Sequence, residues 1–172
     1  MKQLLTILIS TLTIPSSAHS QDKGDWLVEK LRTADTVILV SHAITAGVKI
    51  VDTSTGKDIP LPELIISDKP NYSIVKERQI MTGTQLDTLI KILSRPFEDR
   101  EIEVAKCFMP HHAIFIIKNG VTSYFDICFE CHQFDTSEDL KGIYAFDNRK
   151  WAALRNLFLE LGFKYELGGA KE

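Results

Sequence analysis

An Asn-Gly dipeptide set between two apolar runs is the feature that most constrains this fold. Asn119-Gly120 divides the stretch 107–132 into two segments rich in β-branched, aromatic and aliphatic residues. Asn-Gly favours a two-residue turn whose twist matches that of the strands on either side. The sequence therefore predicts an antiparallel hairpin in which Lys118 lies opposite Val121.

This register also pairs Phe115 with Tyr124, His111 with Cys128 and Cys107 with His132. Directly paired residues share a face and successive residues alternate faces, so the hairpin has one apolar face and one face with potential ligands. We expect the apolar face to pack on the core; it comprises Phe108, Ile114, Ile116, Phe125, Ile127, Phe129 and Cys131. The opposite face comprises Cys107, Met109, His111, Asp126, Cys128, Glu130 and His132, with Phe115, Ile117 and Tyr124 nearer the turn.

Four interpretations of the cysteine and histidine cluster follow, and the first is a structural disulfide with one leftover thiol. Disulfides are the usual fate of cysteine outside the cytoplasm. In the ideal register Cys107 and Cys128 are too far out of line for a bridge, which needs Cα atoms within about 7 Å. Cys107 and Cys131 are nearer, provided that the chain bends at Pro110.

A metal site built from thiolates and imidazoles is the second interpretation. Its candidate ligands are Cys107, His111, Cys128, Cys131 and His132. Such ligands suit Zn²⁺ or copper, although their spacing matches no standard zinc finger or ribbon. On this interpretation Cys107→Ser costs metal and stability, whereas His42→Ala costs neither.

The last two interpretations are covalent haem and a thiol redox pair. Residues 128–132 match C-x-x-C-H, the attachment pattern of c-type haem, but they sit in a strand-like run rather than at a helix start. A thioredoxin-like pair needs a helix N-terminus to lower the thiol pKa. The chain shows no complete set of nucleophile, base and oxyanion donors, so we predict no catalytic residue and a non-enzymatic protein, with a thiol redox protein as the alternative.

The first twenty residues have the pattern of a cleaved signal peptide. Lys2 provides a positive start, 4–14 an apolar core and Ala18-His19-Ser20 a cleavage site. The apolar run is too short to span a membrane, and no cysteine follows it to carry a lipid anchor. The prediction is a periplasmic or secreted protein that begins near Gln21.

Residues 21–172 have the usual size of a single globular domain. The formal net charge of -3 gives no indication of a nucleic-acid or anionic-membrane surface. Neither a substrate nor another partner can be named from the composition.

The remaining patterns predict an α+β fold, with an antiparallel sheet of about five strands and two to three helices packed on one face. Helices are expected over 22–33, from the capping box Thr82–Gln85 to Pro96, and from Asp147 to Gly162. Strands outside the hairpin are expected over 36–41, 48–51, 64–67, 72–81 and 101–106. The acidic stretch 135–139 is expected to be a solvated loop.

Two motifs and a helix carry a resemblance to known proteins. The residues concerned are Cys107-Phe-Met-Pro110-His-His-Ala-Ile114, Asp126-Ile-Cys-Phe-Glu-Cys131 and the helix 154–163. In these features the chain resembles a group of small exported bacterial proteins of unknown function. The resemblance implies a shared fold and a site built on the three cysteines, and it implies no activity.

Overall fold

The computed structural model describes residues 22–48, 50–97, 105, 107–143 and 146–167. The predicted signal peptide lies outside these residues, as does most of the strand expected over 101–106. Within the described part of the chain, no helix is both long enough and apolar enough to cross a membrane.

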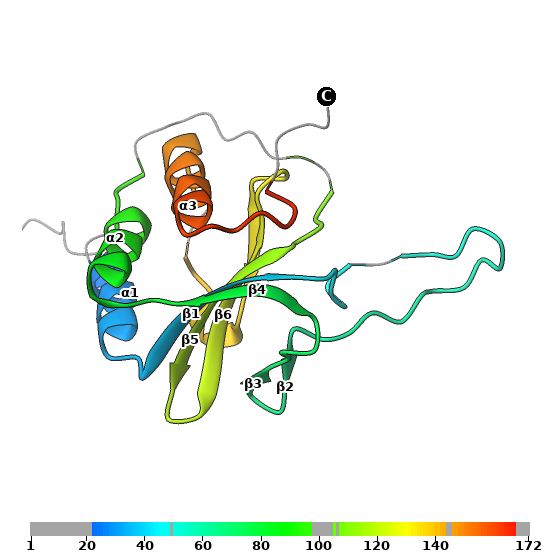
Figure 1. Cartoon of the computed structure of the whole chain (residues 1–172), viewed down its shortest axis with the longest axis horizontal. Coiled ribbons are helices and arrows are strands. Elements are labelled where there is room, and N and C mark those ends of the chain that lie inside the picture. Colours follow the sequence, from blue (N-terminus) through cyan, green and yellow to red (C-terminus); the bar gives the residue numbers. More distant parts are fainter. Residues whose placement is uncertain (1–21, 49, 98–104, 106, 144–145, 168–172) are drawn as a thin grey trace, which may run out of the picture.

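A five-stranded antiparallel sheet forms the centre of the fold, with its strands in the order β4-β1-β5-β6-β7 (Figure 1). Its strands are β1 (Thr36–His42), β4 (Val75–Ile80), β5 (His112–Lys118), β6 (Val121–Cys128) and β7 (Gln133–Thr136). Two short strands, β2 (Ile65–Ile66) and β3 (Lys69–Pro70), pair separately. The predicted α+β class with a sheet of about five strands is confirmed.

The β5–β6 hairpin has the predicted register. Pairing runs from Lys118 opposite Val121 to His112 opposite Ile127. Asn119 and Gly120 have φ values of 52° and 77°, the left-handed conformation that a tight hairpin turn requires at both positions. The ladder ends one pair before the predicted His111–Cys128 pair, where the His111 N–H donates to the Ile127 carbonyl at 3.2 Å.

Helices α1 (Asp22–Arg32), α2 (Gly83–Leu93) and α3 (Asn148–Glu160) lie on one side of the sheet (Figure 1). Burial of apolar side chains between these layers drives their packing. This core includes Leu27, Leu31, Leu89, Ile114, Ile116, Phe125, Ile127, Trp151, Leu154 and Phe158. Trp26, the neighbour of Leu27 in α1, lies outside this core and is 41% exposed.

A smaller apolar cluster covers the opposite face of the sheet. It consists of Ile38, Val40, Leu64, Ile74, Ala113 and Phe115. Because β5 is covered on both faces, its side chains from His112 to Ile116 are all buried. In a sheet covered on one side, alternating apolar residues mark the buried face and the residues between them face solvent. Here both faces of β5 are buried, so the alternation marks no solvated face.

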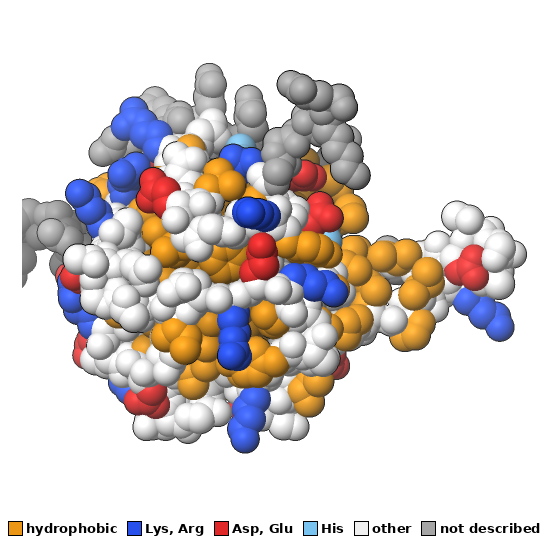
Figure 2. Space-filling view, viewed as in Figure 1, with side chains coloured by type: hydrophobic (Ala, Val, Ile, Leu, Met, Phe, Trp, Pro, Cys, Tyr) orange, Lys and Arg blue, Asp and Glu red, His pale blue; other side chains and the backbone are white. Residues whose placement is uncertain are grey.

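Residues 46–62 form an arm that projects from the body of the domain (Figure 1). The strand expected over 48–51 is absent from its described residues, where Val51 and Asp58 form an isolated bridge. The two halves of the arm hydrogen-bond to each other, for example from the Ile59 N–H to the Ile50 carbonyl at 2.8 Å. Val51 and Ile59 are exposed, and Figure 2 shows hydrophobic side chains on the surface of the arm.

The acidic stretch 135–139 is partly structured, which corrects the prediction of a loop. Asp135 and Thr136 belong to β7, and a 3₁₀ turn, η1 (Glu138–Leu140), follows. β7 forms because a short turn returns the chain directly to the free edge of β6, where backbone groups still need partners.

The N-terminus of α3 provides a test of the packing. Asp147 is fully buried and its carboxylate accepts a hydrogen bond from the Lys150 N–H at 2.7 Å. Asp147→Ala removes this cap, so we expect the free energy of unfolding to fall by about 1–2 kcal/mol in urea titrations. Asp147→Asn keeps an acceptor and should cost less; equal losses in the two variants would show that the carboxylate charge matters more than the cap.

Candidate functional site

A disulfide closes the turn between β6 and β7. It joins Cys128, the last residue of β6, to Cys131, with the two Cα atoms 5.3 Å apart. The prediction of a disulfide with one leftover thiol is thus confirmed. The pairing differs from the Cys107–Cys131 bridge that the hairpin register favoured, because the tight turn at 129–132 brings the two ends of C-x-x-C together.

The third cysteine lies against this disulfide. Cys107 is an exposed free thiol whose Sγ is 3.8 Å from the Sγ of Cys131. Its segment is held beside the turn, since the Ala105 N–H donates to the Cys131 carbonyl at 3.1 Å. The Gln133 side chain also donates to the carbonyls of Ala105 and Cys107. The structure therefore brings all three cysteines together.

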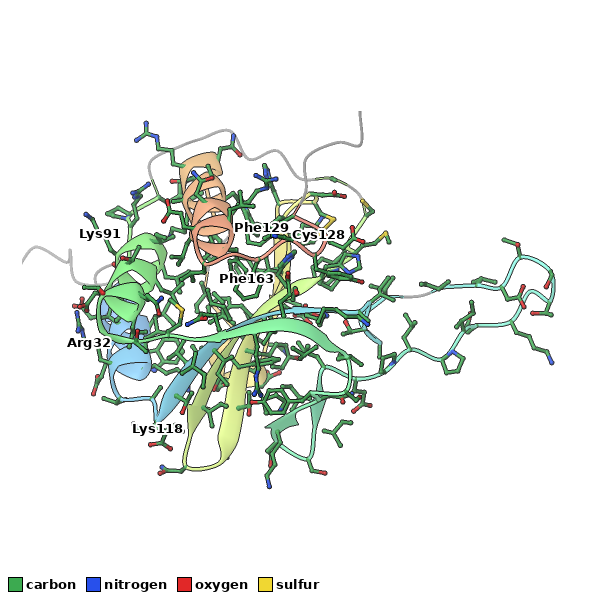
Figure 3. All side chains as sticks on the ribbon, in the orientation of Figure 1. Arg32, Lys91, Lys118, Cys128, Phe129 and Phe163 are labelled. Carbon is green, nitrogen blue, oxygen red and sulfur yellow. A yellow bond between two sulfur atoms is a disulfide. The ribbon has the colours of Figure 1, made fainter. Side chains whose placement is uncertain are left out.

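A pocket of about 120 Å³ lies at Cys128, the other cysteine of the bridge. It is lined by Met109, His111, His112, Cys128, Phe129, Glu130 and Glu166. Cys128 and Phe129 are labelled in Figure 3, where Phe129 lies between α3 and the disulfide. The Cys131 N–H donates to the Cys128 Sγ at 3.2 Å, so one sulfur of the bridge already accepts a hydrogen bond.

The C-terminal segment contributes Glu166 to this pocket, and Glu77 on β4 anchors that segment. The Glu77 carboxylate accepts hydrogen bonds from the N–H groups of Lys164 and Tyr165, at 3.0 and 3.1 Å, and from the Ser41 hydroxyl at 2.7 Å. Burial raises the pKa of Glu77, but these hydrogen bonds outweigh burial and lower it. They fix the backbone that leads to Glu166.

The two histidines of the pocket differ in chemistry. His112 is buried and its Nε2–H donates to the Tyr165 carbonyl at 3.0 Å. Burial lowers the pKa of His112 to about 3, so its ring is neutral at physiological pH. His111 is partly exposed and its Nδ1–H donates to the His42 carbonyl at 3.3 Å.

The five predicted metal ligands are only partly gathered. His111 shares the pocket with Cys128, whereas His132 stacks on Trp151 with ring centroids 5.5 Å apart. Among the described residues, no group of three or more His, Cys, Asp or Glu side chains is arranged to hold a metal ion. A bridged cysteine offers neither the thiolate that a metal binds nor the thiol that haem attachment consumes, so both interpretations stay predictions that require the reduced protein.

Sequence reasoning missed a buried ion pair between β1 and β6. The His42 Nε2–H donates to Asp126 Oδ1 at 3.0 Å, and the Thr45 hydroxyl donates to Asp126 Oδ2 at 3.3 Å. The His42 Nδ1–H donates to the Ala43 carbonyl at 2.7 Å. Both ring nitrogens thus face acceptors, which favours the imidazolium. Asp126 within an apolar strand was the available signal, since a buried carboxylate requires a partner.

This pair corrects the expectation that His42→Ala leaves stability unchanged. His42 is fully buried and Asp126 is nearly so. Removal of one partner of a buried ion pair leaves an uncompensated charge and typically costs about 3–5 kcal/mol. With both ring nitrogens engaged, the role of His42 is to hold the sheet together rather than to accept a substrate proton.

Comparison with known protein families, with curated proteins and with solved structures finds no match to this chain. The resemblance to small exported bacterial proteins therefore stays a prediction.

The buried histidines predict a stability maximum near pH 6.5. Burial lowers the pKa of His42, but Asp126 outweighs burial and raises it above 6.5, so stability falls as the pH rises through the folded pKa. Burial lowers the pKa of His112 to about 3, so stability falls as the pH drops below 6.5. The acidic slope, which His112 sets, approaches about 1.4 kcal/mol per pH unit in urea titrations, and the alkaline slope has the opposite sign. His42→Gln should flatten the alkaline side and His112→Phe the acidic side; unchanged slopes would contradict these assignments.

Reductant and chelator should act differently on stability. The bridge spans a sequence separation of only 3, and so short a loop contributes about 2 kcal/mol. We therefore expect dithiothreitol to lower the melting temperature while the protein stays folded, as judged by circular dichroism, and EDTA to have no effect. On the metal interpretation, EDTA would lower the melting temperature and dithiothreitol would not.

Proposed function

We propose that this chain is an exported domain that carries out thiol–disulfide exchange at the Cys128–Cys131 bridge. The observation that carries the proposal is the exposed Cys107 thiol, 3.8 Å from the Cys131 sulfur. A persistent disulfide is compatible with a location outside the cytoplasm. The predicted signal peptide supports the same location.

The internal step needs no external oxidant. The Cys107 thiol loses its proton to solvent, and the thiolate attacks Cys131 Sγ. A Cys107–Cys131 bond forms, the Cys128–Cys131 bond breaks, and Cys128 leaves as a thiolate. The Cys131 N–H, already 3.2 Å from the Cys128 sulfur, stabilises the developing negative charge on that sulfur.

Exchange with a substrate uses the same bond. A first substrate thiolate attacks Cys128, forming a mixed disulfide and releasing the Cys131 thiolate. A second substrate thiolate attacks the substrate sulfur of that mixed disulfide, which releases an oxidised substrate dimer and leaves Cys128 as a thiolate. Two substrate thiols are oxidised and one protein disulfide is reduced. The reduced protein runs the sequence in reverse on a substrate disulfide.

The energetics suit exchange in the folded protein. The bridge closes a very short loop, so its loss removes only about 2 kcal/mol of stability and leaves the hairpin ladder and both apolar clusters intact. A disulfide whose main task was stabilisation would gain more from closing a longer loop.

The second candidate function is a purely structural disulfide, called a staple below, and the burial of the two sulfurs favours it. Cys128 and Cys131 are 3% and 2% exposed, so little of either sulfur is open to a thiol in solution. The two candidates differ in one consequence: a staple keeps Cys128 bonded to Cys131 at all times.

Alkylation of the oxidised protein distinguishes them. We expect iodoacetamide, applied without reductant at about pH 8.5, near the ordinary thiol pKa, to label both Cys107 and Cys128 in peptide maps. The internal step transfers the free thiol from one position to the other. Cys107→Ser should show no label at Cys128, because it lacks the attacking sulfur. Label confined to Cys107 in the wild type, together with an intact Cys128–Cys131 peptide, would establish the staple.

A further inference from the structure

The two sulfurs of the bridge are approached from different directions. Cys131 has the Cys107 sulfur at 3.8 Å, whereas Cys128 lines the pocket. We infer that this pocket is where a substrate sulfur meets Cys128, and that it selects small thiols or disulfides that carry a positive charge. The inference rests on the proposed exchange and adds to it the chemical class of the substrate.

The size of the pocket limits what enters. Its volume of about 120 Å³ is well below the roughly 300 Å³ at which sites for drug-sized ligands begin. It accommodates a short aminothiol or the tip of a cysteine side chain. Met109 and Phe129 supply the apolar contact for the methylene groups beside the substrate sulfur.

The charge of the lining favours cations. Glu130 and Glu166 are exposed and line the opening, and the described lining residues include no Lys or Arg. His112 stays neutral and so does not offset the two carboxylates. The opposite charge closest to Glu166 along the chain is Lys164, whose side chain is exposed and which does not line the pocket.

Charge close to the reacting sulfur changes the rate of exchange. Two carboxylates within a Debye length, about 8 Å at physiological salt, attract an ammonium group and repel a carboxylate. An ammonium probe and a carboxylate probe differ by two charges, so we expect the carboxylates to shift their relative rates by about fivefold to tenfold.

The test compares cysteamine with 3-mercaptopropionate, two small thiols that carry an ammonium and a carboxylate group respectively. Reduction of the oxidised protein by each probe is followed by mass spectrometry of the mixed disulfide and of the reduced protein. Each rate in the wild type is divided by the rate in Glu130→Gln/Glu166→Gln, which cancels the intrinsic reactivity of the probe. The matched control is Glu63→Gln, an exposed carboxylate that does not line the pocket.

We expect the double substitution to slow cysteamine and to accelerate 3-mercaptopropionate, so that the ratio of the two rates falls fivefold to tenfold. The first mixed disulfide should map to Cys128, and Glu63→Gln should leave the ratio unchanged. Reaction of both probes at the same relative rate in the wild type and the double variant would overturn the charge selection and leave the proposed exchange standing. A mixed disulfide at Cys131 would overturn the assignment of the pocket, and no reaction with either probe would overturn the exchange itself.

Discussion

The pairing of β5 with β6 is the interaction on which the rest of the structure depends. It is fixed by the left-handed conformation of Asn119 and Gly120, and a slip of one residue would reverse the faces of every side chain in the hairpin. The observed register directs Ile114 and Phe125 toward the helices and Phe115 toward the smaller cluster. It also brings Cys128 to the end of β6, where the chain must turn.

The disulfide lies at this turn and closes only a short loop, with a sequence separation of 3. The β6 strand is already held by β5 on one side and β7 on the other, so its end needs no covalent link to stay in place. The bridge instead presents one sulfur to a thiol of the same chain and the other to a pocket. In the proposed exchange, the Cys107 thiol would act at Cys131 and an external substrate at Cys128.

Two sets of polar contacts arrange the surroundings of that bond. The His42–Asp126 pair ties β1 to β6 across β5, and the Glu77 carboxylate anchors the backbone at Lys164 and Tyr165. The first interaction fixes the strand that carries Cys128, and the second fixes the segment that carries Glu166. The His42–Asp126 pair belongs to the low-dielectric interior, where a fully partnered charge specifies one arrangement and an unpartnered charge is costly.

The sequence by itself determined the secondary structure that local chemistry controls. The Asn119-Gly120 turn, the capping box at Thr82 and the C-terminal Gly162 each encode a backbone conformation within a few residues, and all three appear as predicted. The same Asn-Gly turn set the register of the hairpin, and the predicted helices and strands together indicated the α+β class.

Only the tertiary structure decided which sulfurs bond and what surrounds them. Cys107 reaches Cys131 through a segment whose path depends on its contacts with Gln133, and the ladder beyond Pro110 is not regular enough to extrapolate. His42 and Asp126 are separated by 84 positions and meet only when the sheet is assembled. The His42–Asp126 pair and the pocket at Cys128 are both built from side chains of several elements. Contacts between residues so far apart in the chain cannot be predicted from a local sequence pattern.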